Sequence, residues 1–150
     1  MLSQTAEYAL RATIYLAANA RDHLVPVGEI AEALDVPANY LSKILHQLAR
    51  AGIFASVRGP HGGFRLAIPA EQLPIGRVIG LFDDVVTDRR RCFLGRPECS
   101  DTNPCGAHHR WKSIAVDVQT FFRETTIDDV LANGGLGRKQ RATSSARKRR

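Results

Sequence analysis

The sequence lacks any apolar run of the roughly 18 residues that a membrane-spanning helix needs. Its apolar N-terminal segment is interrupted by Glu7 and Arg11 and lacks a small-residue cleavage pattern, which argues against a secretory signal. It contains no internal repeat, no Gly-Lys-Ser/Thr phosphate loop and no nucleophile–base constellation. We therefore expect a cytoplasmic protein that is not an enzyme and that has no membrane partner and no small-molecule substrate.

Acidic residues are missing from the end of the chain. Residues 137–150 hold seven of the 21 basic residues and none of the 15 acidic ones. The rest of the chain then has 14 basic and 15 acidic residues, so the net charge of +6 does not argue for DNA binding by the folded part. Because the tail has little apolar surface to bury, we expect residues 134–150 to be a disordered basic tail. It would either solubilise the protein or add non-specific affinity for phosphates.

Cysteine is scarce, yet Cys92, Cys99 and Cys105 lie within fourteen residues of one another. An odd number of cysteines in a cytosolic chain favours metal or redox chemistry over a disulfide framework. His108 follows three residues after the last cysteine, and three thiolates with an imidazole suit zinc or an iron–sulphur cluster. The spacing is looser than zinc usually prefers, and the alternative that the cysteines are merely tolerated stays open.

Apolar residues recur at helical spacing between residues 27 and 50 and predict two short consecutive helices. The tripeptide Asp35-Val36-Pro37 forms the tight turn between them, and Gly52 stands where the second helix should end. The apolar faces consist of Ile30, Ala31 and Leu34 in the first helix and of Leu41, Ile44, Leu45 and Leu48 in the second. The opposite face of the second helix is polar and carries Asn39, Ser42, Lys43, His46 and Arg50.

Two strand patterns follow, at residues 54–57 and 64–68, and they flank the turn Arg58-Gly59-Pro60-His61-Gly62-Gly63. Helix, tight turn, helix and basic hairpin predict a winged helix-turn-helix, whose second helix lies in the major groove of DNA with the hairpin beside it. A polar helix face alone is often only a solvated surface, but the arginine at the hinge of a glycine-rich tip favours DNA binding. A nucleotide-binding loop is disfavoured because this turn joins two strands.

The remaining helices frame this unit. A helix over residues 3–20 is apolar on most sides, so we expect it to pack on the helix-turn-helix and on a partner subunit. Shorter helices are expected near residues 75–82 and 127–132. Asn103 as N-cap and Pro104 in the first turn predict a helix of 21 residues ending at Glu124, about 30 Å long. The small head cannot cover such a helix, so we interpret it as a dimerisation helix.

These elements predict a mainly α protein: a winged helix-turn-helix head with a two-stranded β wing and a long C-terminal dimerisation helix. We place the DNA-binding domain at residues 1–83, a cluster-binding loop at 84–103, and the dimerisation helix with its end cap at 104–133. Cys105 would lie in the first turn of the long helix, where the helix dipole favours a thiolate.

Several stretches taken together resemble one family of regulators. They are Gln4-Thr5-Ala6-Glu7-Tyr8-Ala9-Leu10-Arg11, Tyr40-Leu41-Ser42-Lys43-Ile44-Leu45, Arg58-Gly59-Pro60-His61-Gly62-Gly63-Phe64, and the three-cysteine loop ending in His108 and Trp111. Over residues 1–133 the chain resembles winged helix-turn-helix transcriptional regulators of the IscR/NsrR/RirA type, which carry an iron–sulphur cluster. Two departures are His61, where glycine is more usual, and Val27, which replaces a polar helix cap.

The resemblance implies a homodimer that binds partly palindromic double-stranded promoter DNA and usually represses transcription. It implies DNA contacts by Asn39, Ser42, Lys43 and Arg58. We add Tyr40 and the departing residue His61 as further candidates for DNA contact. The resemblance also implies that Cys92, Cys99 and Cys105 hold a 2Fe–2S or 4Fe–4S cluster. The fourth ligand would be His108 or, as in nitric-oxide sensors, an acid that matches Glu7; we favour His108.

The sequence as a whole thus predicts a transcriptional repressor whose operator affinity is controlled by an iron–sulphur cluster. The cluster would sense nitric oxide, redox state or the supply of iron and clusters. The alternative is a winged-helix regulator with a zinc site or with cluster-free redox-sensing thiols. An electron carrier is a further rival, but it would need four good ligands and no wing.

Overall fold

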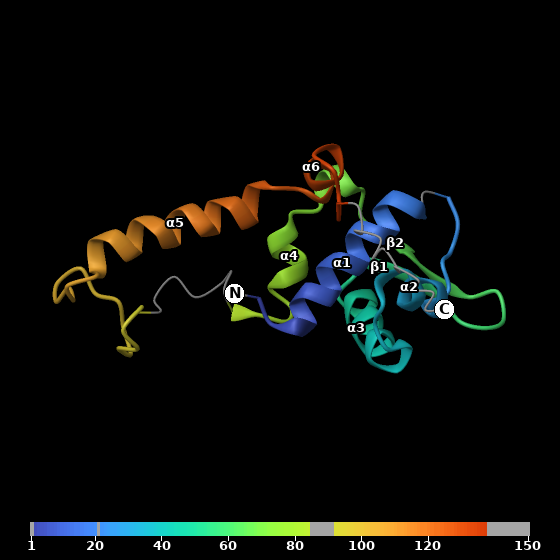
Figure 1. Ribbon diagram of the computed structural model, residues 1–150, viewed down its shortest axis with the longest axis horizontal. Helices are drawn as coiled ribbons and strands as arrows, with labels where there is room; N and C mark the ends of the chain where they lie inside the picture. Colours follow the sequence, from blue (N-terminus) through green and yellow to red (C-terminus); the bar gives the residue numbers. More distant parts are fainter. Residues whose placement is uncertain (1, 21, 85–91, 138–150) are drawn as a thin grey trace, which may run out of the picture.

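The computed structural model describes residues 2–20, 22–84 and 92–137, and Figure 1 shows a head of short helices from which one helix extends. The elements are α1 (Gln4–Asn19), α2 (Val27–Leu34), α3 (Ala38–Arg50), β1 (Phe54–Val57), β2 (Gly63–Leu66), η1 (Ala70–Gln72), α4 (Ile75–Ile79), α5 (His108–Glu124) and α6 (Ile127–Ala132). The predicted fold class, mainly helical with a two-stranded wing, is confirmed.

Helix α1 is the central element of the head. Its first turn is capped by Ser3, whose side chain accepts a hydrogen bond from the Ala6 N–H, as the sequence predicts. Ala6, Ala9 and Ala12 are fully buried, and side chains this small let neighbouring helices approach closely. Accordingly α1 contacts α2, α3, α4, α6 and β2.

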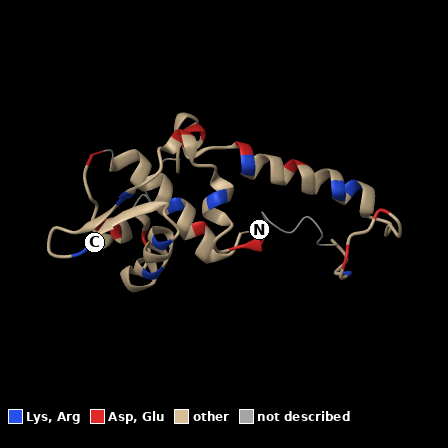
Figure 2. Cartoon of the chain, turned by 180° about the vertical axis from the view of Figure 1, so that it is seen from behind, with Lys and Arg blue, Asp and Glu red and all other residues tan. Residues whose placement is uncertain are grey.

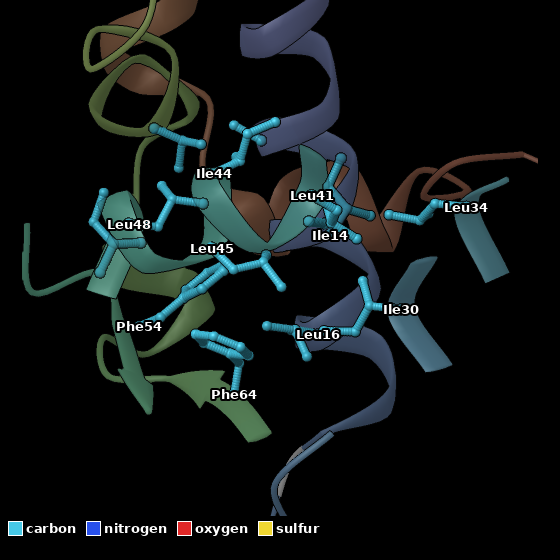
Figure 3. Packing of buried hydrophobic residues seen from close by; sticks show 14 of the residues in the cluster. Ile14, Leu16, Ile30, Leu34, Leu41, Ile44, Leu45, Leu48, Phe54 and Phe64 are labelled. Atoms are coloured by element: carbon cyan, nitrogen blue, oxygen red, sulfur yellow. The ribbon is translucent and has the colours of Figure 1, made fainter. Parts of the chain in front are cut away.

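The core lies where α1, α2, α3 and the wing meet (Figure 3). Helices α2 and α3 contribute the apolar faces that their spacing predicts. The core side chains are Ile14 and Leu16 from α1, Ile30 and Leu34 from α2, Leu41, Ile44, Leu45 and Leu48 from α3, and Phe54 and Phe64 from the wing. Burial of such side chains stabilises the fold by about 1.5–3 kcal/mol each. The polar face of α3 consequently points away from the core.

The tight turn between α2 and α3 is the predicted one. Asp35 adopts the left-handed conformation at φ 56°, which ends α2, and Val36 donates to the Ala31 carbonyl at 3.0 Å. Gly52 follows α3 with φ 73°, as expected for a residue that terminates a helix. At the other end of α2 the N-cap is Pro26 and not Val27, which is the first helical residue. This cap makes no side-chain hydrogen bond.

The wing is an antiparallel hairpin in which Phe54 pairs with Leu66 and Val57 pairs with Gly63. Val25 flanks the other side of the hairpin and exchanges two hydrogen bonds of 2.9 Å with Phe64. This approach explains Gly63, because a Cβ there would lie 2.5 Å from the Val25 carbonyl oxygen. Gly59 is required for a different reason, since it turns the tip with φ 107°.

Helix α5 corrects the prediction for the long helix. It begins at His108, with Ala107 as an N-cap that makes no side-chain hydrogen bond, and not at Pro104. The carbonyl of Asn103 accepts a hydrogen bond from Arg96, and the His108 N–H donates to the Cys105 carbonyl in a turn that precedes the helix. Cys105 therefore lies before α5, and the helix-dipole argument for its thiolate is wrong in that form.

The chain returns to the head after α5. The Ile75 N–H donates to the Thr125 carbonyl and the Ile127 N–H donates to the Leu73 carbonyl, each at 2.9 Å. These two hydrogen bonds connect the junction of α5 and α6 to the segment that leads into α4. Helix α6, near the predicted residues 127–132, starts with a capping box of Thr126 and Asp129. None of the helices in the described part of the chain is long and apolar enough to cross a membrane.

Candidate functional site

A surface hollow of about 510 Å³ lies between α3 and the wing. It is lined by Ser42, Lys43, His46, Ala49, Arg50, Ser56 and Arg58. Three cations and an imidazole thus surround one concavity, and Figure 2 shows basic residues on α3 and at the wing. A concave surface with clustered cations is suited to the phosphate backbone of a nucleic acid.

The structure brings three of the predicted DNA-binding residues together in this hollow: Ser42, Lys43 and Arg58. Asn39 is exposed in the first turn of α3, and His61 is exposed in the wing loop, both outside the lining of the hollow. Tyr40 is partly exposed, but its hydroxyl is hydrogen-bonded to Thr5 and its ring packs edge-on against Tyr8. Helix α3, the recognition helix of the helix-turn-helix, is therefore attached to α1 through Tyr40.

Sequence reasoning did not assign a DNA contact to His46, Arg50 or Ser56. His46 and Arg50 stand one turn apart on the polar face of α3, and the His46 ring packs edge-on against Phe64 at 5.2 Å. The helical period already placed both on the face of Ser42 and Lys43, so this signal was present in the sequence. The position of Ser56 beside α3 could not be predicted from a local pattern, because it depends on how the wing packs against α3.

The second group of candidate functional side chains lies at the N-terminal end of α5. Cys92 is buried, Cys99 and Cys105 are half-buried, and none of the three forms a disulfide. The side chains of Cys92 and Cys105 are hydrogen-bonded, and Cys99 is close enough to both for their charges to affect it. The loop thus brings the three predicted cysteines together. The three consecutive arginines at 89–91 lie outside the described residues.

His108 joins this group from the first position of α5. It is only 2 % exposed, and its Nδ1 lies 3.2 Å from the Sγ of Cys99. Its Nε2 lies 2.8 Å from the Oδ1 of Asp101. Lys112, one turn further along α5, contacts both oxygens of Asp101 at 2.7 Å. His108 therefore faces a thiol with one nitrogen and a carboxylate with the other.

The environment sets the ionisation of these groups in different directions. Hydrogen bonds from Lys112, and then from His108, lower the pKa of Asp101 to about 2, so it is a carboxylate at neutral pH. Hydrogen bonds from the backbone N–H groups of Arg96 and Leu94 lower the pKa of Cys92. Burial, followed by the charges of Cys92 and Cys105, raises the pKa of Cys99. The loop therefore lowers the pKa of one cysteine thiol and raises that of a neighbouring one.

The cysteines and His108 do not form a site for a single metal ion in the described part of the chain. Within residues 2–20, 22–84 and 92–137 no group of three His, Cys, Asp or Glu side chains is arranged to hold a single ion. The donors are hydrogen-bonded to one another, as the pairs Cys92–Cys105 and Cys99–His108 illustrate. The chemical types of these side chains, three thiols and an imidazole, nevertheless suit an iron–sulphur cluster, which is held mainly by cysteine thiolates.

Glu7, the other predicted fourth ligand, lies on α1. Its carboxylate pairs with Arg11 at 3.7 Å, and its side chain is mostly exposed. It takes no part in the group formed by the cysteines and His108 in this chain.

The helix pair with its tight turn, the wing and the basic hollow define a winged helix-turn-helix DNA-binding protein. The chain belongs to the Rrf2 family, described as iron-dependent transcriptional regulators, whose model matches residues 2–133. Membership makes it a transcription regulator and not an enzyme. The predicted resemblance to regulators of the IscR type is thereby confirmed.

Relatives agree with this assignment. A protein of Aquifex aeolicus, named only provisionally as an HTH-type transcriptional regulator, is 41% identical over 133 residues, which is 87% of this chain and 91% of the relative. The HTH-type transcriptional regulator IscR of Vibrio atlanticus is 31% identical over 130 residues, or 87% of this chain and 74% of the relative.

Solved structures share the fold. CymR, the global cysteine regulator of B. subtilis, matches with a TM-score of 0.74 at 21% identity, covering 89% of this chain and 97% of CymR. IscR of T. potens matches with a TM-score of 0.69 at 21% identity, covering 89% and 87%. The oxidized form of Staphylococcus aureus CymR matches with a TM-score of 0.68 at 25% identity, covering 87% and 94%.

Proposed function

We propose that this protein is a dimeric, cytoplasmic transcriptional repressor whose affinity for promoter DNA is set by an iron–sulphur cluster bound to Cys92, Cys99 and Cys105. The observation that carries the proposal is the convergence of these three cysteines and buried His108 at one end of α5. The IscR relatives and the iron-dependent family description support it. A cluster at this place would supply reactivity toward oxygen or nitric oxide, or sensitivity to iron supply.

His108 is the fourth ligand that we favour. Its Nδ1 already faces Cys99, whereas Glu7 is paired with Arg11 on α1. A buried imidazole one turn from Cys105 needs little rearrangement to join the cysteines, because the Cys105–His108 turn is already hydrogen-bonded. Glu7 would have to come from the first helix, and the partner subunit is the natural source in a dimer.

DNA would be bound by α3 in the major groove and by the wing beside it. The exposed polar face of α3 and the hollow shared with Arg58 support this arrangement. Asn39, Ser42 and Lys43 would face the bases, while Arg58 would enter the minor groove. His61, at the exposed wing tip, would contact phosphates.

The dimer would form along α5. Ile114 and Phe121 are 51% and 55% exposed, and Val116 is exposed as well, so this helix carries apolar surface that the chain does not cover. An apolar hollow of about 460 Å³ at its base includes Leu2, Leu10, Val118 and Phe121. Phe122 is not part of this exposed surface, because it is only 4% exposed and belongs to the core of its own chain.

The architecture offers a route from the cysteines to the DNA-binding surface. Helix α5 carries the cysteine loop at one end and packs against α4 at the other, and α4 in turn contacts α1 (Figure 1). A change in the loop would shift α5 and hence the angle between two heads in a dimer. Coupling of about 1–3 kcal/mol would change operator affinity roughly 5–150-fold, which is sufficient for a switch.

The test is the visible absorption spectrum of the full chain after anaerobic purification. The proposal expects an iron–sulphur chromophore that is lost when Cys92, Cys99 or Cys105 is changed to serine, because a hydroxyl is a poorer ligand for iron. Glu7→Ala should keep the spectrum, and His108→Ala should shift it. A colourless, iron-free protein that binds its operator fully would refute the cluster.

Cluster-free thiol sensing is the second candidate. The proximity of the free Cys92 and Cys105 side chains supports thiol sensing. The likeness to CymR, which is named as a cysteine regulator and has a solved oxidized form, also supports it. This reading expects a colourless protein whose DNA binding changes on mild oxidation and returns on reduction. Counting free thiols before and after oxidation separates it from the cluster.

A further inference from the structure

We propose that Asp101 is a positioning residue, which holds the His108 ring so that its Nδ1 faces the cysteines. This inference rests on the proposed function, since it says how the favoured fourth ligand is prepared. It starts from the contrast between the two residues: His108 is 2% exposed, whereas the Asp101 side chain is 67% exposed. Asp101 thus lies at the surface, and its Oδ1 contacts the Nε2 of the buried His108 ring at 2.8 Å.

The direction of that hydrogen bond follows from the chemistry of the two groups. The Lys112 ammonium donates to both oxygens of Asp101, which makes the carboxyl group an acceptor, so we assign the proton of this contact to the Nε2 of His108. In a neutral imidazole the other nitrogen then has a free lone pair. That nitrogen, Nδ1, is the one that lies 3.2 Å from the Cys99 Sγ.

This pattern is what metal-binding histidines require. A ligating histidine usually donates its other N–H to a carboxylate or carbonyl, which fixes the tautomer and makes the ligating nitrogen more basic. Asp101 provides the carboxylate on the side of the ring opposite to Cys99. The ring therefore presents its lone pair toward the cysteines before any metal arrives.

Lys112 is the second partner of Asp101. His108 and Lys112 are one turn apart on α5, and the loop residue Asp101 bridges them through both of its oxygens. The bridge also holds the loop against α5, which suggests a purely structural alternative for Asp101. The two roles can be separated, because the Lys112 contact holds only the loop, whereas the His108 contact also sets the ring.

The first experiment uses the metal-free full chain, with histidine labelled with nitrogen-15, at a fixed neutral pH. Ring nitrogen shifts report the tautomer, and the missing signals in His108→Gln assign His108. The wild type should show a neutral ring with the proton on Nε2. Asp101→Ala should give a mixture of tautomers, Asp101→Glu should restore the wild-type pattern, and Lys112→Met should keep it.

Glu98→Gln is the matched control, since it removes one carboxylate from an exposed position of the same loop. It should leave the His108 signals unchanged. If Lys112→Met changes the tautomer as much as Asp101→Ala, the role of Asp101 is only to hold the loop. A wild-type ring that is doubly protonated, or protonated on Nδ1, would overturn the proposal.

The second experiment compares the same variants after anaerobic reconstitution with iron and sulphide. The nitrogen-15 hyperfine signal of a histidine ligand should weaken in Asp101→Ala, and the cluster should be lost to a chelator about 10–100-fold faster, the usual effect of losing such a partner. Asp101→Glu should recover most of both. Equal lifetimes and equal hyperfine signals in wild type and Asp101→Ala would reject the inference.

The two ideas fail in different ways. If the wild type takes up no cluster, the proposed function fails, and the tautomer experiment still decides whether Asp101 sets the ring of His108. If the wild type takes up a cluster without a histidine hyperfine signal, His108 is not the ligand and Asp101 has no ligand to position.

Discussion

The hydroxyl groups of Tyr40 and Thr5 are hydrogen-bonded at 2.5 Å, which joins the first turn of the recognition helix to the first turn of α1. The Tyr40 ring also packs edge-on against Tyr8, with the ring centres 5.9 Å apart. Nearby, the Ser3 N–H donates to Asp83 at 2.6 Å, in the segment that leads toward the cysteine loop. The N-terminal turn of α1 therefore contacts both the recognition helix and the approach to the loop.

This relationship predicts how Tyr40 acts. Tyr40→Phe keeps the ring contact with Tyr8 but removes the hydrogen bond, and Thr5→Val removes it from the other side. We expect each substitution to weaken operator binding by a similar free energy, about 0.5–1.5 kcal/mol. The reason is that each removes the hydrogen bond that holds α3 on α1. The double variant should be hardly weaker than either single variant.

Binding measurements on all four proteins check this prediction. A direct DNA contact, the role that the sequence suggested for Tyr40, would instead make Tyr40→Phe much weaker than Thr5→Val. In that case the effects of the two substitutions would add.

The basic hollow yields a second prediction. Arg58→Ala and Lys43→Ala should each cost about 1–3 kcal/mol of specific operator binding if these side chains read a groove. Arg50→Ala should weaken binding to all sequences about equally and reduce the salt dependence, as expected for a phosphate contact. Titrations on operator and random duplexes at several salt concentrations distinguish the two classes. Arg123→Ala, on α5, is the control and should bind as wild type does.

Much of the head could be predicted because its signals are local. The caps at Ser3 and Thr126, the helix-ending Gly52 and the alternating residues of the wing are decided by neighbours within a few positions. The apolar faces of α2 and α3 follow from the helical period alone. The same period also indicated which face of α3 would be exposed.

The start of α5 could not be predicted, because it depends on contacts within a loop that has no periodicity. These contacts join residues seven to eleven positions apart. Arg96 binds the Asn103 carbonyl, and Asp101 folds back to His108 and Lys112. These contacts let the chain turn once more before the helix begins. The cysteines and His108 could be identified from their spacing, but no sequence pattern pointed to Asp101.

The exposed apolar face of α5 yields a third prediction. Ile114→Glu with Phe121→Glu should convert the protein to monomers, because two charges would be buried in the proposed interface. Sedimentation should report the change in mass, and operator affinity should fall because two heads no longer bind together. Leu136→Glu places the same charge at an exposed apolar residue outside α5 and should leave the dimer intact. A dimer in both variants would place the interface elsewhere.

The basic tail supports a fourth prediction, although residues 138–150 lie outside the described residues. Truncation after Gly137 removes seven positive charges and no negative one. Binding to every duplex should weaken by about the same factor, and the salt dependence should become shallower, because fewer counterions are released. Affinity measured over a salt series checks this. A loss limited to one operator would instead show that the tail reads sequence.

The capping box of α6 gives a prediction about pH. The Asp129 carboxylate accepts hydrogen bonds from the backbone N–H and the hydroxyl of Thr126, both at 2.8 Å. These bonds, the backbone one first, lower the pKa of Asp129 from its ordinary 3.8. A carboxyl whose pKa is lower in the folded state stabilises that state above its unfolded pKa and ceases to do so as the pH falls through the folded value.

Asp129→Asn should therefore lower the melting temperature at neutral pH, because α6 packs on η1 and α1 and buries Ile127 completely. The difference from wild type should shrink as the pH drops below about 4 and should vanish once the wild-type carboxyl is protonated. Melting curves of both proteins from pH 7 to pH 3 measure it. Asp128→Asn removes the same charge next to the capping box and should show a much smaller difference. A loss that is independent of pH would mean that the shape of the side chain, and not its charge, stabilises α6.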